Sequence, residues 1–126
     1  MTISARRADR LAEAARTFDG GVHCVAADVA DEDQVVNLVR EHTEHFGRLD
    51  VLVNSAGIGG AESSATADTA QVHLQVAVNL RGPLLVTREA LPLLLAAGAE
   101  HGKALIVNLS SVSGKMVCPG WRVTRP

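Results

Sequence analysis

The 126-residue sequence contains no tyrosine, and aromatic residues make up only 2% of it. Its two cysteines, Cys24 and Cys118, are too few for a disulfide framework, which predicts a reducing, cytoplasmic location. A net charge of −2 without a basic stripe excludes the electrostatic footprint of a nucleic-acid-binding protein. The apolar run at 91–98 contains Pro92 and is far shorter than the ~20 residues of a membrane span. The first ten positions contain three arginines and no long apolar core, so no secretory signal is expected.

The remaining composition, 47% hydrophobic and 21% charged, is ordinary for one globular domain. Short β-branched runs alternate with helical patterns along the chain, and this alternation is typical of a parallel α/β sheet. We expect strands at residues 1–5, 22–26, 49–53 and 104–109, and helices at about 8–17, 31–47 and 69–97. The predicted order is therefore β-α-β-α-β-α-β.

Two of these helices carry local signals. Asp31 is expected to cap the second helix with Gln34 as its reciprocal partner, and Gly47 is expected to end that helix. In the third helix, three apolar residues have the spacing of one buried face. They are Val72, Val76 and Leu80.

Polar or small residues follow all four predicted strands. Ligands of an open parallel sheet bind outside the carboxyl ends of its strands, so these positions form the candidate site. They are Arg6 and Arg7, Asp28, Asn54 to Gly57, and Ser110 with Ser111. Each has a simpler alternative: solvated surface for the arginines, a turn cap for Asp28, and a turn or loop for the others. Their shared edge and their order favour a site.

Five short motifs occur along the chain in a characteristic order. They are Ile3-Ser4-Ala5-Arg6-Arg7, Asp28-Val29, Leu52-Val53-Asn54-Ser55-Ala56-Gly57, Asn79-Leu80-Arg81-Gly82, and Ile106-Val107-Asn108-Leu109-Ser110-Ser111 followed by Gly114. With them the sequence resembles the short-chain dehydrogenase/reductase family, compact Rossmann oxidoreductases that use NAD(P)(H). The resemblance covers residues 1–120 and not the tail 121–126. It implies a partial Rossmann fold, a doubly wound parallel sheet whose first strand is missing.

The resemblance implies cofactor-binding roles at three strand ends. Arg6 and Arg7 follow the strand that faces the adenosine ribose, where a basic side chain pairs with a 2′-phosphate and an acidic one bonds a 2′-hydroxyl. With no acidic residue there, NADP(H) is favoured over NAD(H). Asp28 is expected to bond the adenine amino group and Val29 to contact the ring. The loop that passes close to the cofactor is expected to contain Asn54, Ala56 and Gly57.

The same resemblance implies two catalytic residues and a small carbonyl or alcohol substrate. Ser111 matches the serine that hydrogen-bonds the substrate carbonyl, and Ser110 is the weaker candidate. Asn79 matches an asparagine whose backbone carbonyl holds a water in a proton relay. Pro83 gives a local reason for this, because proline has no N–H to bond the carbonyl four residues before it.

Two pieces of the family pattern are absent from these 126 residues. One is the initial strand with its glycine-rich, pyrophosphate-binding turn, and the other is the catalytic tyrosine with its lysine. We therefore expect an internal fragment of a reductase that is inactive by itself. One alternative is a non-catalytic truncated product that binds a full-length relative, or a second copy, through helix 69–97, or that has no role. Another is an unrelated nucleotide-binding module. No metal site is expected, because no carboxylate or cysteine cluster accompanies His42 and His45.

Overall fold

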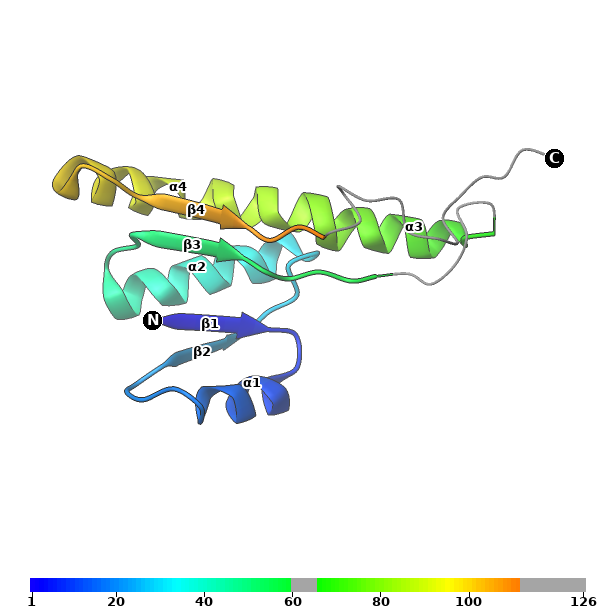
Figure 1. Cartoon of the computed structure of the whole chain (residues 1–126), viewed down its shortest axis with the longest axis horizontal. Coiled ribbons are helices and arrows are strands. Elements are labelled where there is room, and N and C mark those ends of the chain that lie inside the picture. The colour runs from blue at the N-terminus through cyan, green and yellow to red at the C-terminus, as the bar shows by residue number, and fades with distance from the viewer. Residues whose placement is uncertain (60–65, 112–126) are drawn as a thin grey trace.

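The computed structural model describes residues 1–59 and 66–111 (Figure 1). Its elements are β1 (Thr2–Ala5), α1 (Ala8–Ala15), β2 (His23–Ala26), α2 (Glu32–Phe46), β3 (Val51–Asn54), α3 (Thr69–Val76), a π-helical turn (Ala77–Arg81), α4 (Gly82–His101) and β4 (Leu105–Asn108). This order confirms the predicted α/β fold. Gly114, Cys118 and the tail expected at 121–126 lie outside the described residues.

The four strands form two parallel pairs, β1 with β2 and β3 with β4. Thr2 lies opposite His23 in the first pair, and Val51 lies opposite Leu105 in the second. Figure 1 shows β1 between β2 and β3, with the arrows of β1, β3 and β4 pointing the same way. No hydrogen-bonded ladder joins β1 to β3. The arrangement is that of a partial Rossmann sheet in two halves.

Helices α2 and α4 hold the two strand pairs together. α2 packs against β2 and α4, and α4 packs against β3 and β4. Where the two helices meet, the fully buried Val35 of α2 forms a cluster with Leu85 and Val86 of α4, and Leu52 of β3 packs on it. Figure 1 shows α1 on the side of the β1–β2 pair that lies away from α2. Helix packing thus fixes the two halves where backbone hydrogen bonds do not.

The ends of α2 form as the sequence predicts. The carboxylate of Asp31 accepts hydrogen bonds from the backbone N–H of Gln34 at 3.2 Å and from its side-chain amide at 2.8 Å. These bonds, the backbone one foremost, hold the pKa of Asp31 below its ordinary value because they stabilise the charged form. Gly47 ends the helix at φ 68°, a left-handed conformation that favours glycine.

A histidine of α2 ties β1 to the segment that precedes β3. The Nε2 of His42 lies 2.9 Å from the backbone carbonyl oxygen of Arg48, and its Nδ1 lies 2.8 Å from the hydroxyl of Thr2. A carbonyl only accepts, so Nε2 carries the proton, and in the neutral ring the Thr2 hydroxyl donates to Nδ1. One imidazole ring therefore bridges the two halves.

The helix predicted at 69–97 is interrupted, and its predicted buried face is wrong. The π-helical turn at Ala77–Arg81 separates α3 from α4. Val72, Val76 and Leu80 are 43%, 51% and 60% exposed, whereas residues of a neighbouring stripe, among them Val78 and Leu85, are buried. The spacing identified an apolar stripe correctly, but α2 and the strands pack against a different one. None of the helices within residues 1–59 and 66–111 has the length and apolarity needed to cross a membrane.

Candidate functional site

Arg6 and Asp28 lie together at the carboxyl ends of β1 and β2. Arg6 Nη1 stands 4.0 Å from Asp28 Oδ2, and both side chains are partly exposed. Asp28 Oδ1 accepts a 2.9 Å hydrogen bond from the backbone N–H of Ala30. This bond confirms the turn-capping alternative for Asp28, and its role toward adenine stays a prediction. Arg7 is the next residue, at the N-cap of α1, and its side chain makes no capping bond.

The segment after β2 lies directly against the start of α4. A Cβ atom at Gly82 would stand 2.9 Å from Val29 Cγ2 and 3.1 Å from the Val29 carbonyl oxygen, so only glycine allows this approach. Arg81 Nη1 also donates a 2.9 Å hydrogen bond to the carbonyl of Ala30. Val29, the predicted adenine contact, is thereby placed beside the helical turn that contains Asn79.

Asn54 joins the carboxyl ends of β3 and β4 through its side chain. Its Nδ2 donates to Asn108 Oδ1 at 2.8 Å and to the Thr87 hydroxyl on α4 at 3.3 Å. Its carbonyl accepts a 2.9 Å bond from the backbone N–H of Leu109. The side chain of Asn54 is thus engaged within the fold, and it orients the start of the loop that runs through Ala56 to Gly57.

Asn79 holds the same loop through its side chain. Its Oδ1 accepts from the backbone N–H of Ile58 at 2.8 Å, and its Nδ2 donates to the Ile58 carbonyl at 2.8 Å. A Cβ atom added at Gly57 would stand 3.6 Å from Asn79 Oδ1, an ordinary contact distance. Asn79 lies inside the π-helical turn, a feature that is frequent at functional sites. The sequence predicted a role for its carbonyl, and the structure adds one for its amide.

The predicted site residues therefore form two clusters. One contains Arg6 and Asp28, and the other contains Asn54, Gly57 and Asn79. Contact of Val29 with Gly82 links them. Ser110 and Ser111 lie just after β4, beyond Leu109, at the strand edge where Asn54 ends β3, and both are exposed.

A network of charged side chains lies next to the contact between Val29 and Gly82 that links the two clusters. Glu32, the first residue of α2, accepts from Arg88 Nη2 at 2.7 Å and from Arg81 Nη2 at 2.8 Å. The Arg88 hydrogen bond, with the nearby positive charges, holds the pKa of Glu32 below its ordinary value. The same bond is the main reason why the pKa of Arg88 is raised. The network fastens the start of α2 to the π-helical turn through Arg81 and to α4 through Arg88.

Sequence reasoning missed two residues of the site. Thr87 and Asn108 complete the hydrogen bonds of Asn54. Asn108 belongs to the last of the five sequence motifs. Strand register could have identified it, because it lies opposite Asn54 in the β3–β4 pair. Thr87 is an ordinary helix residue in the sequence, and only the packing of α4 on β3 reveals it.

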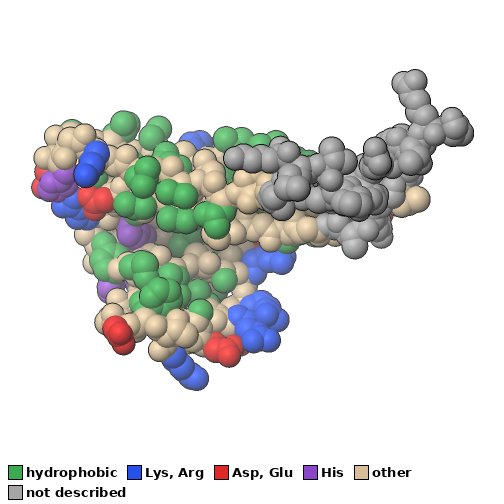
Figure 2. All heavy atoms as spheres, viewed as in Figure 1, with side chains coloured by type: hydrophobic (Ala, Val, Ile, Leu, Met, Phe, Trp, Pro, Cys, Tyr) green, Lys and Arg blue, Asp and Glu red, His purple; other side chains and the backbone are tan. Residues whose placement is uncertain are grey.

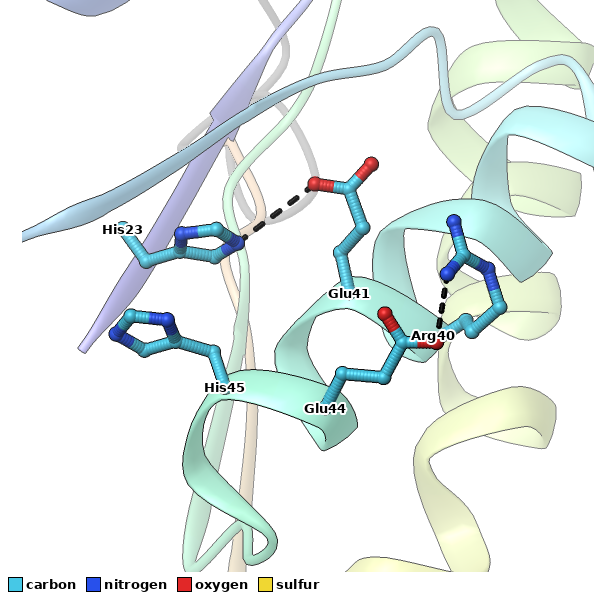
Figure 3. Close-up of a pocket in the computed structure, with 5 residues that line it drawn as sticks. All are labelled: His23, Arg40, Glu41, Glu44 and His45. Carbon is cyan, nitrogen blue, oxygen red and sulfur yellow. Dashed lines mark hydrogen bonds and ion pairs between the residues drawn. The ribbon is translucent and has the colours of Figure 1, made fainter.

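A separate pocket of about 350 Å³ lies near the amino end of β2 (Figure 3). It is lined by His23, Arg40, Glu41, Glu44 and His45. The rings of His23 and His45 stack with centroids 4.5 Å apart, and His23 Nε2 lies 3.7 Å from a Glu41 carboxylate oxygen. In the described part of the chain, no three His, Cys, Asp or Glu side chains are arranged to hold a metal ion. The pocket stands at the opposite end of β2 from Asp28.

The fold and its strand-end residues define an α/β protein of the Rossmann type. A family model described as short chain dehydrogenase matches residues 1–123. The chain belongs to this family, whose members are oxidoreductases that bind a nicotinamide cofactor.

Three similar proteins illustrate the match. Sulfoacetaldehyde reductase 2 of Chromohalobacter salexigens is 37% identical, over 98% of this chain and 49% of its own length. The 2-(R)-hydroxypropyl-CoM dehydrogenase of Xanthobacter autotrophicus is 40% identical, over 90% of this chain and 46% of its own length. The structure of 3-ketoacyl-(acyl-carrier-protein) reductase from Brucella melitensis, complexed with NADH, superposes with a TM-score of 0.89 at 29% identity, covering 95% of this chain and 50% of that one. The chain spans about half the length of the curated relatives it matches.

Proposed function

We propose that this chain is part of an oxidoreductase that transfers hydride between NADP(H) and a small carbonyl or alcohol substrate. The observation that carries the proposal is the gathering of the candidate residues at the carboxyl ends of the strands, where ligands of such sheets bind. The names of two relatives, an aldehyde reductase and a hydroxyalkyl dehydrogenase, support this substrate class.

The residues at this edge fit a dinucleotide. Arg6 carries a partly exposed guanidinium, and β1 ends without an acidic residue. Ala56 and Gly57 are small, so a ligand can approach the backbone of this loop closely. NADP(H) supplies the hydride when it is bound. Asn79 and Asn54 keep the loop in place, and the Ser111 hydroxyl donates a hydrogen bond to the substrate oxygen, where negative charge develops.

The preference for NADP(H) is tested with Arg6 and Arg7. In a protein that contains this segment together with the remainder of the family's length, Arg6→Ala with Arg7→Ala should weaken NADPH binding about tenfold or more and NADH binding much less. The reason is that charge-assisted bonds to the 2′-phosphate are lost, each worth ~1.5–3 kcal/mol. Arg10→Ala is the matched control, because Arg10 already pairs with Glu13 on α1. Equal losses for the two cofactors would contradict the assignment.

We further propose that the 126 residues alone do not catalyse the reaction. They contain Ser111 and Asn79 but no tyrosine to act as the acid, and loss of a general acid costs ~10²–10⁴-fold in rate. Purified chain should show no oxidation of NADPH with a panel of ketones and aldehydes, while a chain extended at both ends serves as the positive control. NADPH-dependent turnover by contaminant-free 126-residue protein would overturn this proposal.

The alternative function is binding of a relative or of a second copy through the helical tract 69–97. One observation favours it: the apolar stripe left exposed along α3 and α4. The stripe consists of Val72, Val76, Leu80, Leu84, Leu91 and Leu95. An exposed apolar surface of this kind marks a site of association.

A further inference from the structure

The segment between β2 and α2 contains Asp28 and Val29, the two residues that the sequence predicts to contact adenine. It lies beside the start of α4 (Figure 1). Both residues are partly buried, and Val29 packs against the cluster of Val35, Leu85 and Val86. Recognition of a base requires a fixed direction for the Asp28 carboxylate, because a hydrogen bond weakens steeply when its geometry is poor.

Two sets of hydrogen bonds hold Asp28. Its backbone N–H donates to Gln34 Oε1 at 2.9 Å, and its carbonyl accepts from the N–H of Asp31 at 3.0 Å. Its side chain is held through Ala30, whose N–H donates to Oδ1 at 2.9 Å. The other carboxylate oxygen, Oδ2, lies 4.0 Å from Arg6 Nη1, beyond hydrogen-bond distance. The position of Ala30 therefore sets the direction of the carboxylate and leaves Oδ2 able to accept a further bond.

Ala30 is in turn held by Arg81. Arg81 Nη1 donates a 2.9 Å hydrogen bond to the carbonyl of Ala30, so Ala30 is fastened at its N–H by Asp28 and at its C=O by Arg81. The next residue, Gly82, leaves the space that Val29 occupies. Two consecutive residues of the helical tract thus fix the two residues that follow Asp28.

The guanidinium of Arg81 is itself fixed at its second nitrogen. Nη2 donates to one oxygen of Glu32 at 2.8 Å, and the other oxygen of Glu32 accepts from Arg88 Nη2 at 2.7 Å. The Arg81 side chain is 48% exposed, and exposed ion pairs contribute little to stability. A hydrogen bond from a guanidinium to a carbonyl is charge-assisted and directional. The bond to Ala30 is therefore the contact through which Arg81 acts on the segment, and the ion pair keeps the guanidinium in place.

We propose that Arg81 is a positioning residue for the adenine of the cofactor. By holding the carbonyl of Ala30, it keeps the Ala30 N–H on Asp28 Oδ1, so that Oδ2 accepts from the 6-amino group of the base. The inference rests on the proposed function, because it assumes that NADP(H) lies at this edge with its adenine on Asp28 and Val29. It assigns discrimination of the base to a residue 51 positions from Ala30 along the chain.

The probe is adenosine 2′,5′-bisphosphate, the adenosine half of NADP(H). Its expected partners are Arg6 for the 2′-phosphate and Asp28 and Val29 for the base, all within the described residues. The comparison ligand is purine riboside 2′,5′-bisphosphate, which lacks only the 6-amino group. Calorimetric titration of the 126-residue chain should give about fivefold or more tighter binding of the adenosine form, because the other form leaves the carboxylate without its hydrogen bond.

Substitutions at Arg81 test its role. Arg81→Ala should reduce the preference for the 6-amino group to about twofold or less, because the carboxylate is no longer held in one direction. Arg81→Lys can still donate to Ala30 and should retain part of the preference, whereas Asp28→Ala should abolish it. Arg88→Ala is the matched control, because Arg88 bonds the same Glu32 carboxylate from α4. This variant should keep the preference of the wild type.

The ratio of the two affinities separates positioning from stability. A variant that only loosens the fold weakens both ligands by the same factor and leaves their ratio unchanged, whereas a variant that misplaces the carboxylate changes the ratio. Circular dichroism and urea midpoints show whether Arg81→Ala and Arg88→Ala are equally folded. Arg81→Met, which keeps most of the length of the side chain without its donors, gives the same test if Arg81→Ala does not fold.

A preference that falls in Arg81→Ala and persists in Arg88→Ala supports the proposal. An unchanged preference in Arg81→Ala, or an equal fall in Arg88→Ala, overturns it and leaves the proposed function intact. If neither Arg81→Ala nor Arg81→Met folds, Arg81 is structural and the proposal is also wrong. A wild-type chain that binds neither ligand, or binds both equally, contradicts the adenine site of the proposed function, and the inference falls with it.

Discussion

A single carbon atom at position 82 would overlap the segment between β2 and α2. Gly82→Ala places a Cβ 2.9 Å from Val29 Cγ2 and 3.1 Å from its carbonyl oxygen, and backbone has to move to relieve the second contact. We expect a loss of ~1–3 kcal/mol in stability, as for other overpacked sites. Urea unfolding followed by circular dichroism measures it.

Gly98→Ala is the matched control in the same helix. A Cβ there meets nothing closer than 3.9 Å, so the helix propensity of alanine should stabilise the chain by ~0.5–1 kcal/mol. Equal effects of the two substitutions would show that contact with Val29 does not constrain Gly82.

Glu32 gives the chain a pH dependence. Because its pKa is lowered in the folded state, chiefly by the Arg88 hydrogen bond, its contribution is present above the unfolded pKa and is lost as pH falls through the folded one. The stability difference between wild type and Glu32→Gln should therefore shrink from about pH 6 to about pH 3. Thermal melting at a series of pH values checks this, with Glu44→Gln as the control for a carboxylate paired only within α2. A constant difference over this range would rule out the ion pairs as its source.

Individual residues also show which parts of the site can be predicted from the sequence. Asp31, Gln34 and Gly47 act locally, and their roles were predicted because capping depends on residues only a few positions apart. Asn54 and Asn79 were located, but their side-chain partners were not, since those partners lie 21 to 54 positions away. Such contacts depend on packing that no local pattern encodes.

At the scale of elements, all four strands and the first two helices lie within a few residues of their predicted places. The third helix was predicted as one stretch from 69 to 97, because Val72, Val76 and Leu80 have helical spacing. The π-helical turn has no local signature beyond Pro83. In the folded chain Asn79 in this turn bonds Ile58, and Gly82 directly after it rests on Val29.

At the scale of the whole molecule, much apolar surface stays exposed. Figure 2 shows hydrophobic side chains gathered over the strand pairs, and Val51, Val53 and Leu105 of β3 and β4 are each at least half exposed. Together with the free strand edges and the helical stripe, this surface predicts a chain that is partly folded, prone to association or dependent on a partner.

Association should be visible in sedimentation velocity as a sedimentation coefficient that rises with concentration. Leu84→Glu with Leu95→Glu places charges on two residues of the stripe that are each 64% exposed, and should shift the chain toward smaller species. Phe18→Glu, an exposed apolar position elsewhere, is the control. A monodisperse monomer with a sharp, cooperative thermal transition would contradict this expectation.

The π-helical turn also affects how this chain should be aligned with other sequences. A π turn holds one residue more than an α-helical turn, and each residue of a helix advances the direction of its side chain by about 100°. An ungapped alignment with an uninterrupted helix would therefore match faces that point in different directions on one side of the turn. A one-residue gap at Ala77–Arg81 restores the correspondence, and it falls in the segment that contains Asn79.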